Sequence, residues 1–108
     1  MTGKDVVPRA LAEQDVNDAL DFYLAEAGQQ VALNFIDALE RAYQMIGEQP
    51  EAGSSRYAHE LELPGLRSWL LRGYPYVVFY MPRDQHIDVW RVLHAARDLP
   101  AWLAGEDA

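Results

Sequence analysis

Apolar residues recur at intervals of three and four over residues 10–27, and again over residues 30–47. This spacing is typical of amphipathic α-helices that bury one face. Gly28 lies between the two stretches and can adopt the left-handed conformation in which many helices end. Because the connection is so short, we expect the two helices to form an antiparallel hairpin.

Shorter apolar stretches on either side of this hairpin predict β-strands. The first, Asp5–Pro8, ends in proline, which has no amide donor and therefore suits an edge strand. Three more strands are expected over residues 67–72, 76–81 and 87–94, separated by turns that contain proline. The middle one of these three is apolar throughout, so it should be central and covered on both faces.

The last predicted strand alternates along its length. A regular strand would place Ile87, Val89, Arg91 and Leu93 on one side of the sheet and the residues between them on the other.

The remaining segments carry weaker signals. Residues 48–55 have the composition of a loop. No element is assigned to residues 59–66, where a Pro-Gly pair indicates a turn before the sheet. A short helix is expected over residues 99–103, with Asp98 as its N-cap.

The resulting order, β-α-α-β-β-β with a helical tail, predicts an α+β fold. The helical hairpin should pack on one face of a small antiparallel sheet with the first strand at its edge. The other face should be only partly covered, and such faces often bind partners. The 108 residues are expected to form a single domain, residues 1–108, large enough for a core without disulfides.

Charge narrows the range of functions. The net charge is −8, with twelve acidic and four basic residues in 1–62 and five of each in the remainder. The acids of the first predicted helix, Asp15 among them, are interpreted as its solvated face. Because neutralising phosphates supplies most non-specific affinity for nucleic acids, this balance disfavours direct nucleic-acid binding.

Three further features concern compartment and cofactors. No apolar stretch is long enough for a signal sequence or a membrane span, so we expect a cytoplasmic protein with no membrane partner. The chain has no cysteine, and its three histidines show no metal-ligand spacing. We therefore expect no metal and no other cofactor.

Arginines and one histidine are concentrated in the predicted sheet and just after it. Arginine can hold phosphates, and histidine can move a proton, as RNA strand cleavage requires. If the protein is a ribonuclease, the catalytic set would be His94, Arg91, Arg97 and Arg72. The structural interpretation is that Arg91 pairs with a carboxylate at the edge of the core. The candidate residues for binding a target or partner are Arg67, Trp69, Arg72, Arg91, His94 and Arg97.

Six segments, taken in order, cover nearly the whole chain. They are D-A-L-D-F-Y-L-A-E-A-G (18–28), A-L-N-F-I-D-A-L-E-R-A (32–42), I-G-E-Q-P-E-A-G (46–53), L-P-G-L-R-S-W (63–69), Y-P-Y-V-V-F-Y (74–80) and I-D-V-W-R-V-L-H-A-A-R-D (87–98). In this combination the chain resembles the RelE/ParE superfamily of toxins from bacterial type II toxin–antitoxin modules, and its ParE-like branch in particular.

The resemblance implies a growth-inhibiting toxin that a cognate antitoxin neutralises. The C-terminal segment of the antitoxin would wrap the helices and the sheet, giving a toxin–antitoxin hetero-oligomer. In this superfamily, RelE-like members cut mRNA on the ribosome, whereas ParE-like members act on DNA gyrase.

The acidic charge and the single lysine favour binding of gyrase over ribonuclease activity. The tail also offers Trp102, where a catalytic tyrosine or a comparable group would be expected beyond His94. A ribosome-dependent endoribonuclease remains the first alternative. The second is a degenerate, inactive toxin that serves only as a binding partner.

Overall fold

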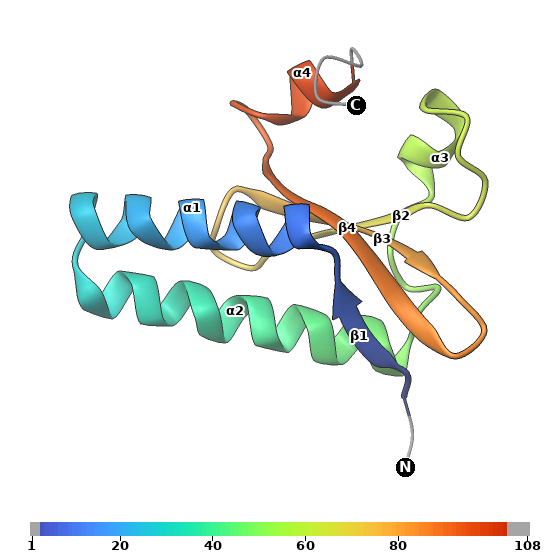
Figure 1. The fold of residues 1–108 in the computed structure, drawn as a ribbon, viewed down its shortest axis with the longest axis horizontal. Helices are drawn as coiled ribbons and strands as arrows, with labels where there is room; N and C mark the ends of the chain where they lie inside the picture. Colours follow the sequence, from blue (N-terminus) through green and yellow to red (C-terminus); the bar gives the residue numbers. More distant parts are fainter. Residues whose placement is uncertain (1–2, 104–108) are drawn as a thin grey trace.

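The computed structural model describes residues 3–103 and shows the expected α+β arrangement (Figure 1). Its elements are β1 (Asp5–Pro8), α1 (Ala10–Glu26), α2 (Gln29–Glu48), α3 (Arg56–Glu60), β2 (Arg67–Leu70), β3 (Tyr76–Pro82), β4 (His86–His94) and α4 (Leu99–Leu103). The predicted helices and strands are confirmed to within a few residues, and β2 ends two residues early. The short helix α3 is an addition that sequence patterns did not indicate.

The two long helices lie side by side and antiparallel (Figure 1). Gly28 has a positive φ of 92° and allows the chain to reverse between them. No helix within residues 3–103 is both apolar and long enough to span a lipid bilayer.

The four strands form one sheet in the order β1-β4-β3-β2. Strands β2, β3 and β4 are antiparallel neighbours, whereas β1 pairs in parallel with β4, as in the register of Val7 with Asp88. The N-terminal strand is therefore an edge strand, as predicted, but the sheet is mixed. Local sequence patterns do not specify the direction in which strands distant in the chain will pair.

Both faces of the sheet are covered. The α1–α2 hairpin packs on one face, where Phe35 and Ile46 of α2 are fully buried with Val78 of β3. On the other face α3 and α4 cover Phe79, whose ring centroid lies 4.5 Å from that of Trp102. The expectation of a partly open second face was wrong, because α3, which sequence patterns did not indicate, closes it together with the expected helix α4.

Strand β4 contains one extra residue, Trp90, relative to β3. Its neighbours Val89 and Arg91 lie opposite Tyr80 and Phe79, which are adjacent in β3. Such a β-bulge shifts the alternation of side chains by one residue.

The bulge overturns the predicted alternation of β4. Ile87 and Val89 pack against the helical hairpin, as does Val92, whereas Leu93 packs on the α3–α4 face. Strict alternation had placed Leu93 with Ile87 and Val89, and no residue of the strand signals the interruption.

Candidate functional site

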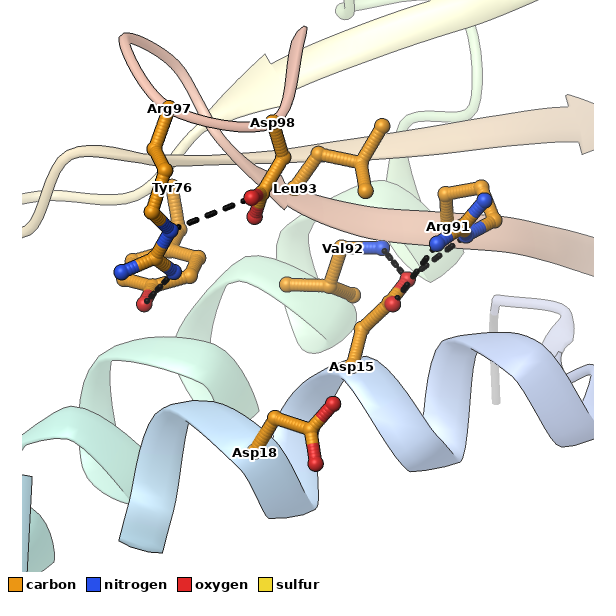
Figure 2. A pocket seen from close by; sticks show the side chains of 8 residues that line it. All are labelled: Asp15, Asp18, Tyr76, Arg91, Val92, Leu93, Arg97 and Asp98. Carbon is orange, nitrogen blue, oxygen red and sulfur yellow. Dashed lines mark hydrogen bonds and ion pairs between the residues drawn. The ribbon is translucent and has the colours of Figure 1, made fainter. Parts of the chain in front are cut away.

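A polar cleft of about 300 Å³ lies where α1 passes the end of β4 (Figure 2). In it, the guanidinium group of Arg91 donates two hydrogen bonds to the carboxylate of Asp15, with N–O distances of 2.8 and 2.9 Å. The same carboxylate accepts the backbone amide of Val92 at 2.9 Å. The side chains of Arg91 and Asp15 are only 14% and 12% exposed. This pair therefore ties α1 to β4, as the structural interpretation of Arg91 expects.

The turn after β4 uses His94 and Arg97 as structural groups. The amides of Ala96 and Arg97 donate to Nδ1 of His94 at 3.1 and 3.0 Å, so this nitrogen is an acceptor and the imidazole proton lies on Nε2. The ring of His94 also packs edge-on against Tyr76, at 5.2 Å between centroids. The guanidinium group of Arg97 donates to the Tyr76 hydroxyl at 3.2 Å and to Asp98 at 3.1 Å (Figure 2).

Asp98 lies directly before α4, and its carbonyl accepts the amide of Trp102. Its carboxylate instead accepts the amide of His94 and the side chain of Arg97, so it stabilises the turn before the helix. Burial alone would raise the pKa of Asp98, but these two donors outweigh it and lower the pKa.

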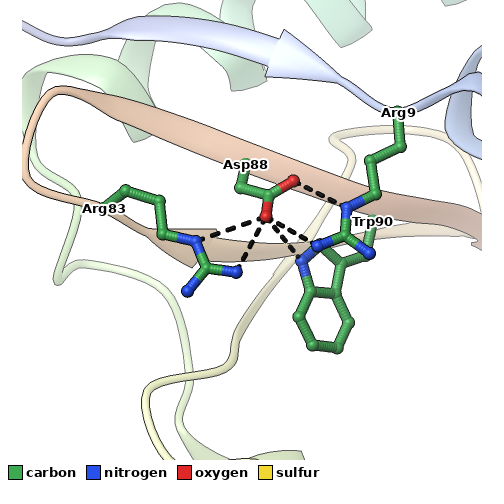
Figure 3. Close-up of polar contacts among 4 residues, drawn as sticks. All are labelled: Arg9, Arg83, Asp88 and Trp90. Atoms are coloured by element: carbon green, nitrogen blue, oxygen red, sulfur yellow. Dashed lines mark hydrogen bonds and ion pairs between the residues drawn. The ribbon is translucent and has the colours of Figure 1, made fainter.

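A carboxylate on β4, that of Asp88, holds two arginines (Figure 3). Arg9 donates at 2.8 and 2.9 Å, Arg83 at 3.0 Å, and the indole nitrogen of Trp90 at 3.1 Å. Burial alone would raise the pKa of Asp88, which is only 8% exposed, but these donors lower it to about 2. The cluster joins the end of β1 and the β3–β4 turn to β4.

A larger groove of about 520 Å³ lies between α2 and the segment that ends β2 and begins the next turn. Small residues of α2, one aromatic residue of β2 and one of the following turn give the groove an apolar floor, and Arg41 and Arg72 also line it. Both arginines are exposed, and within residues 3–103 neither forms a hydrogen bond or an ion pair. The groove is lined by Asn34, Ala38, Arg41, Ala42, Met45, Trp69, Arg72 and Tyr74.

The candidate residues predicted from the sequence thus separate into different places. Arg91 and Arg97 line the cleft, and His94 contacts Tyr76 beside them. Trp69 and Arg72 line the groove. Arg72 is therefore separated from Arg91 and Arg97, with which it would form the catalytic set of a ribonuclease.

Arg67 lines neither cavity and clamps a loop. Its guanidinium group donates to the carbonyls of Glu51 and Gly53, at 3.2 and 2.9 Å.

Two residues at these sites were not predicted from the sequence. The interpretation of Asp15 as part of a solvated face was wrong, because its carboxylate is inside the cleft. Ala12 and Ala19, the two buried residues of α1, lie three positions before and four after Asp15, so they mark the same face. Arg41 had no such signal, since only the tertiary fold brings it to the groove.

The part of the chain that the structure describes holds no group of three acidic or histidine side chains arranged as metal ligands. The cavities are instead lined by charge pairs in one case, and by an apolar floor with two unpaired arginines in the other. Arginine and aromatic side chains such as those of the groove are enriched at protein–protein interfaces.

Comparison with known proteins agrees with the architecture. The family model described as "ParE toxin of type II toxin-antitoxin system, parDE" matches residues 6–99. A chain of a solved structure described as a chromosomal ParDE TA system from P. aeruginosa superimposes with a TM-score of 0.70. The two chains are 19% identical, and the match covers 84% of this chain and 95% of the other, so this likeness shows the fold alone. Among curated proteins, none matches this chain.

Proposed function

The chain belongs to the ParE toxin family, and from this we propose that it inhibits bacterial growth by binding DNA gyrase until a cognate antitoxin neutralises it. The observation that carries the proposal is the family match over residues 6–99, which runs from β1 to the first residue of α4. This match supports the assignment of the chain as the toxin of a type II toxin–antitoxin module. The cytoplasmic target and the mode of neutralisation are the proposed steps beyond it.

The contacts of the cleft support gyrase binding over ribonuclease activity. A phosphate clamp needs guanidinium groups that can turn toward the scissile bond. Arg91 holds the carboxylate of Asp15, and Arg97 holds that of Asp98. Both would have to give up these bonds before they could bind RNA, and the net charge of −8 opposes a polyanion as well.

The surfaces proposed for target and partner binding remain those that carry Arg67, Trp69, Arg72, Arg91, His94 and Arg97. Of these, Arg97 offers the most direct access beside the cleft, since its side chain is 53% exposed. Its guanidinium carbon also lies 5.9 Å from the ring centre of Phe22, an exposed aromatic residue of α1. A protein target could contact this arginine and aromatic ring together.

Inducible expression in a bacterial host, with and without the adjacent reading frame, tests the toxin assignment. We expect growth to stop when the protein is made alone, and to continue when the adjacent product is made with it. The first cellular response should be filamentation and DNA-damage signalling. Continued growth despite soluble protein would instead support a degenerate toxin that acts only as a binding partner.

A purified assay tests the target. The protein should inhibit supercoiling by DNA gyrase, and premixing it with the adjacent product should restore supercoiling. Unchanged supercoiling in a molar excess of the protein would refute the gyrase proposal. An immediate stop of translation, with mRNA cleavage that the substitution His94→Ala abolishes, would establish the ribonuclease alternative.

A further inference from the structure

The groove between α2 and β2 is hollow because of the residues that α2 places there. Ala38 and Ala42 lie four positions apart and present only methyl groups to the groove, opposite Trp69. Met45, one turn further along the helix, is 39% exposed. An apolar side chain from another molecule can therefore pack between the helix and the indole ring without displacing a side chain of this protein.

The two arginines of the groove differ from the other arginines within residues 3–103. Arg9, Arg83, Arg91 and Arg97 bind carboxylates, Arg67 binds backbone carbonyls, and Arg56 lies over the ring of Tyr57. Arg41 and Arg72 have no such partner in that range. The chain carries 17 acidic residues, yet none of those described is placed within ion-pair distance of these two.

We propose that this groove binds a segment of the antitoxin in which an apolar residue is flanked by carboxylates. The apolar side chain packs on Trp69 and the two alanines, and the carboxylates pair with Arg41 and Arg72. The proposal rests on the proposed neutralisation by an antitoxin and adds the chemistry by which this chain recognises it. The apolar floor favours a peptide over a nucleic acid, since phosphates would have only two guanidinium groups to bind in a protein of net charge −8.

Charge reversal in the groove tests the proposal. The purified product of the adjacent reading frame is titrated calorimetrically into the wild type, Arg41→Glu, Arg72→Glu and the double variant. Each single reversal should weaken binding by about tenfold or more, because it replaces an attractive charge contact by a repulsive one. The matched control is Arg56→Glu on α3, which makes the same change of charge on the other face of the sheet and should bind within about twofold of the wild type.

The outcomes distinguish a failure of the proposed groove site from a failure of the proposed neutralisation by an antitoxin. If the wild type and all reversal variants bind equally, the groove is not the site, and neutralisation stands. If the wild type does not bind the adjacent product at all, the proposed neutralisation fails and this inference fails with it. A wild-type dimer in sedimentation that the reversals dissociate, with unchanged antitoxin affinity, would assign the groove to a second copy of the chain and overturn the proposal.

The neutral variants Arg41→Gln and Arg72→Gln serve as controls in case a charge reversal destabilises the fold. Both arginines are exposed, so melting curves of all variants should overlay that of the wild type. A reversal variant that melts early is replaced by its glutamine counterpart, which should still lose several-fold in affinity and show a weaker dependence on salt.

Discussion

The arginines that bind carboxylates at β4 and those of the α2–β2 groove have the same chemistry and opposite surroundings. Arg91 holds a largely buried carboxylate that joins β4 to α1, and Asp88 on the same strand is held by Arg9 and Arg83. In the groove, Arg41 and Arg72 are exposed and have no partner within residues 3–103. The difference shows that contacts made in the fold decide whether an arginine joins elements of the structure or leaves its guanidinium group open to another molecule.

The two environments also differ in what a substitution costs. A buried ion pair contributes little net stability, but removing one partner leaves the other desolvated without compensation. An exposed, unpaired arginine can be removed without such a penalty. Substitutions should therefore lower the free energy of unfolding at the β4 pairs, and change partner binding at the groove.

The largest effect is expected for Asp15→Ala. The substitution removes the acceptor of two Arg91 hydrogen bonds and of the Val92 amide, and should lower the free energy of unfolding by about 3 kcal/mol. Urea denaturation with an unchanged slope measures this loss. Asp18→Ala, an exposed position on the same helix, is the control and should stay within about 0.5 kcal/mol. A loss below about 1 kcal/mol at Asp15 would mean that the pair is not structural.

The next effect concerns pH and Asp88. Its pKa in the folded protein is about 2, below the ordinary value of 3.8. Because the folded pKa is the lower one, the stabilisation is fully present above pH 3.8 and is lost as pH falls through about 2. The free energy of unfolding should fall by about 2 kcal/mol from this group across that window.

Chemical denaturation at several pH values between 5 and 2 checks this prediction. Asp98 also has a lowered pKa and adds a loss of the same sign, so the wild-type slope contains both groups. Asp88→Asn should be less stable at neutral pH and should show a shallower decline in acid. An equal decline in both proteins would show that Asp88 does not carry the pH dependence.

Trp69→Ala should affect both the stability of the fold and the binding of the antitoxin. Trp69 is half-buried and packs against the hydrophobic core, so its truncation should lower the free energy of unfolding by about 1–2 kcal/mol. The same substitution removes the aromatic wall of the groove and should weaken antitoxin binding more than it weakens the fold. Calorimetric titration of the folded variant compares the two effects. A variant with wild-type affinity would remove Trp69 from the proposed interface.

The elements that depend on local periodicity could be predicted from the sequence. The helical hairpin and the core strand β3 follow from apolar spacing, and both are confirmed. The bulge at Trp90 and the parallel pairing of β1 could not be predicted, because each depends on which strand becomes a neighbour. The same limit applies to the sites. Arg91 and Asp15 are 76 positions apart, and only the packing of α1 on the sheet brings them together.

The smallest effect on stability is expected for Arg72→Ala, and Arg91→Ala is the substitution with which it is compared. The two substitutions remove the same side chain. At Arg72 the free energy of unfolding should change by less than about 0.5 kcal/mol, since no described bond is broken. At Arg91 it should fall by about 3 kcal/mol, because the carboxylate of Asp15 is left without its guanidinium partner in a site that is mostly shielded from water. Parallel urea titrations of the two variants decide the matter. Equal losses of unfolding free energy would mean that Arg72 has a structural partner in solution. The groove would then no longer be supported as a binding surface.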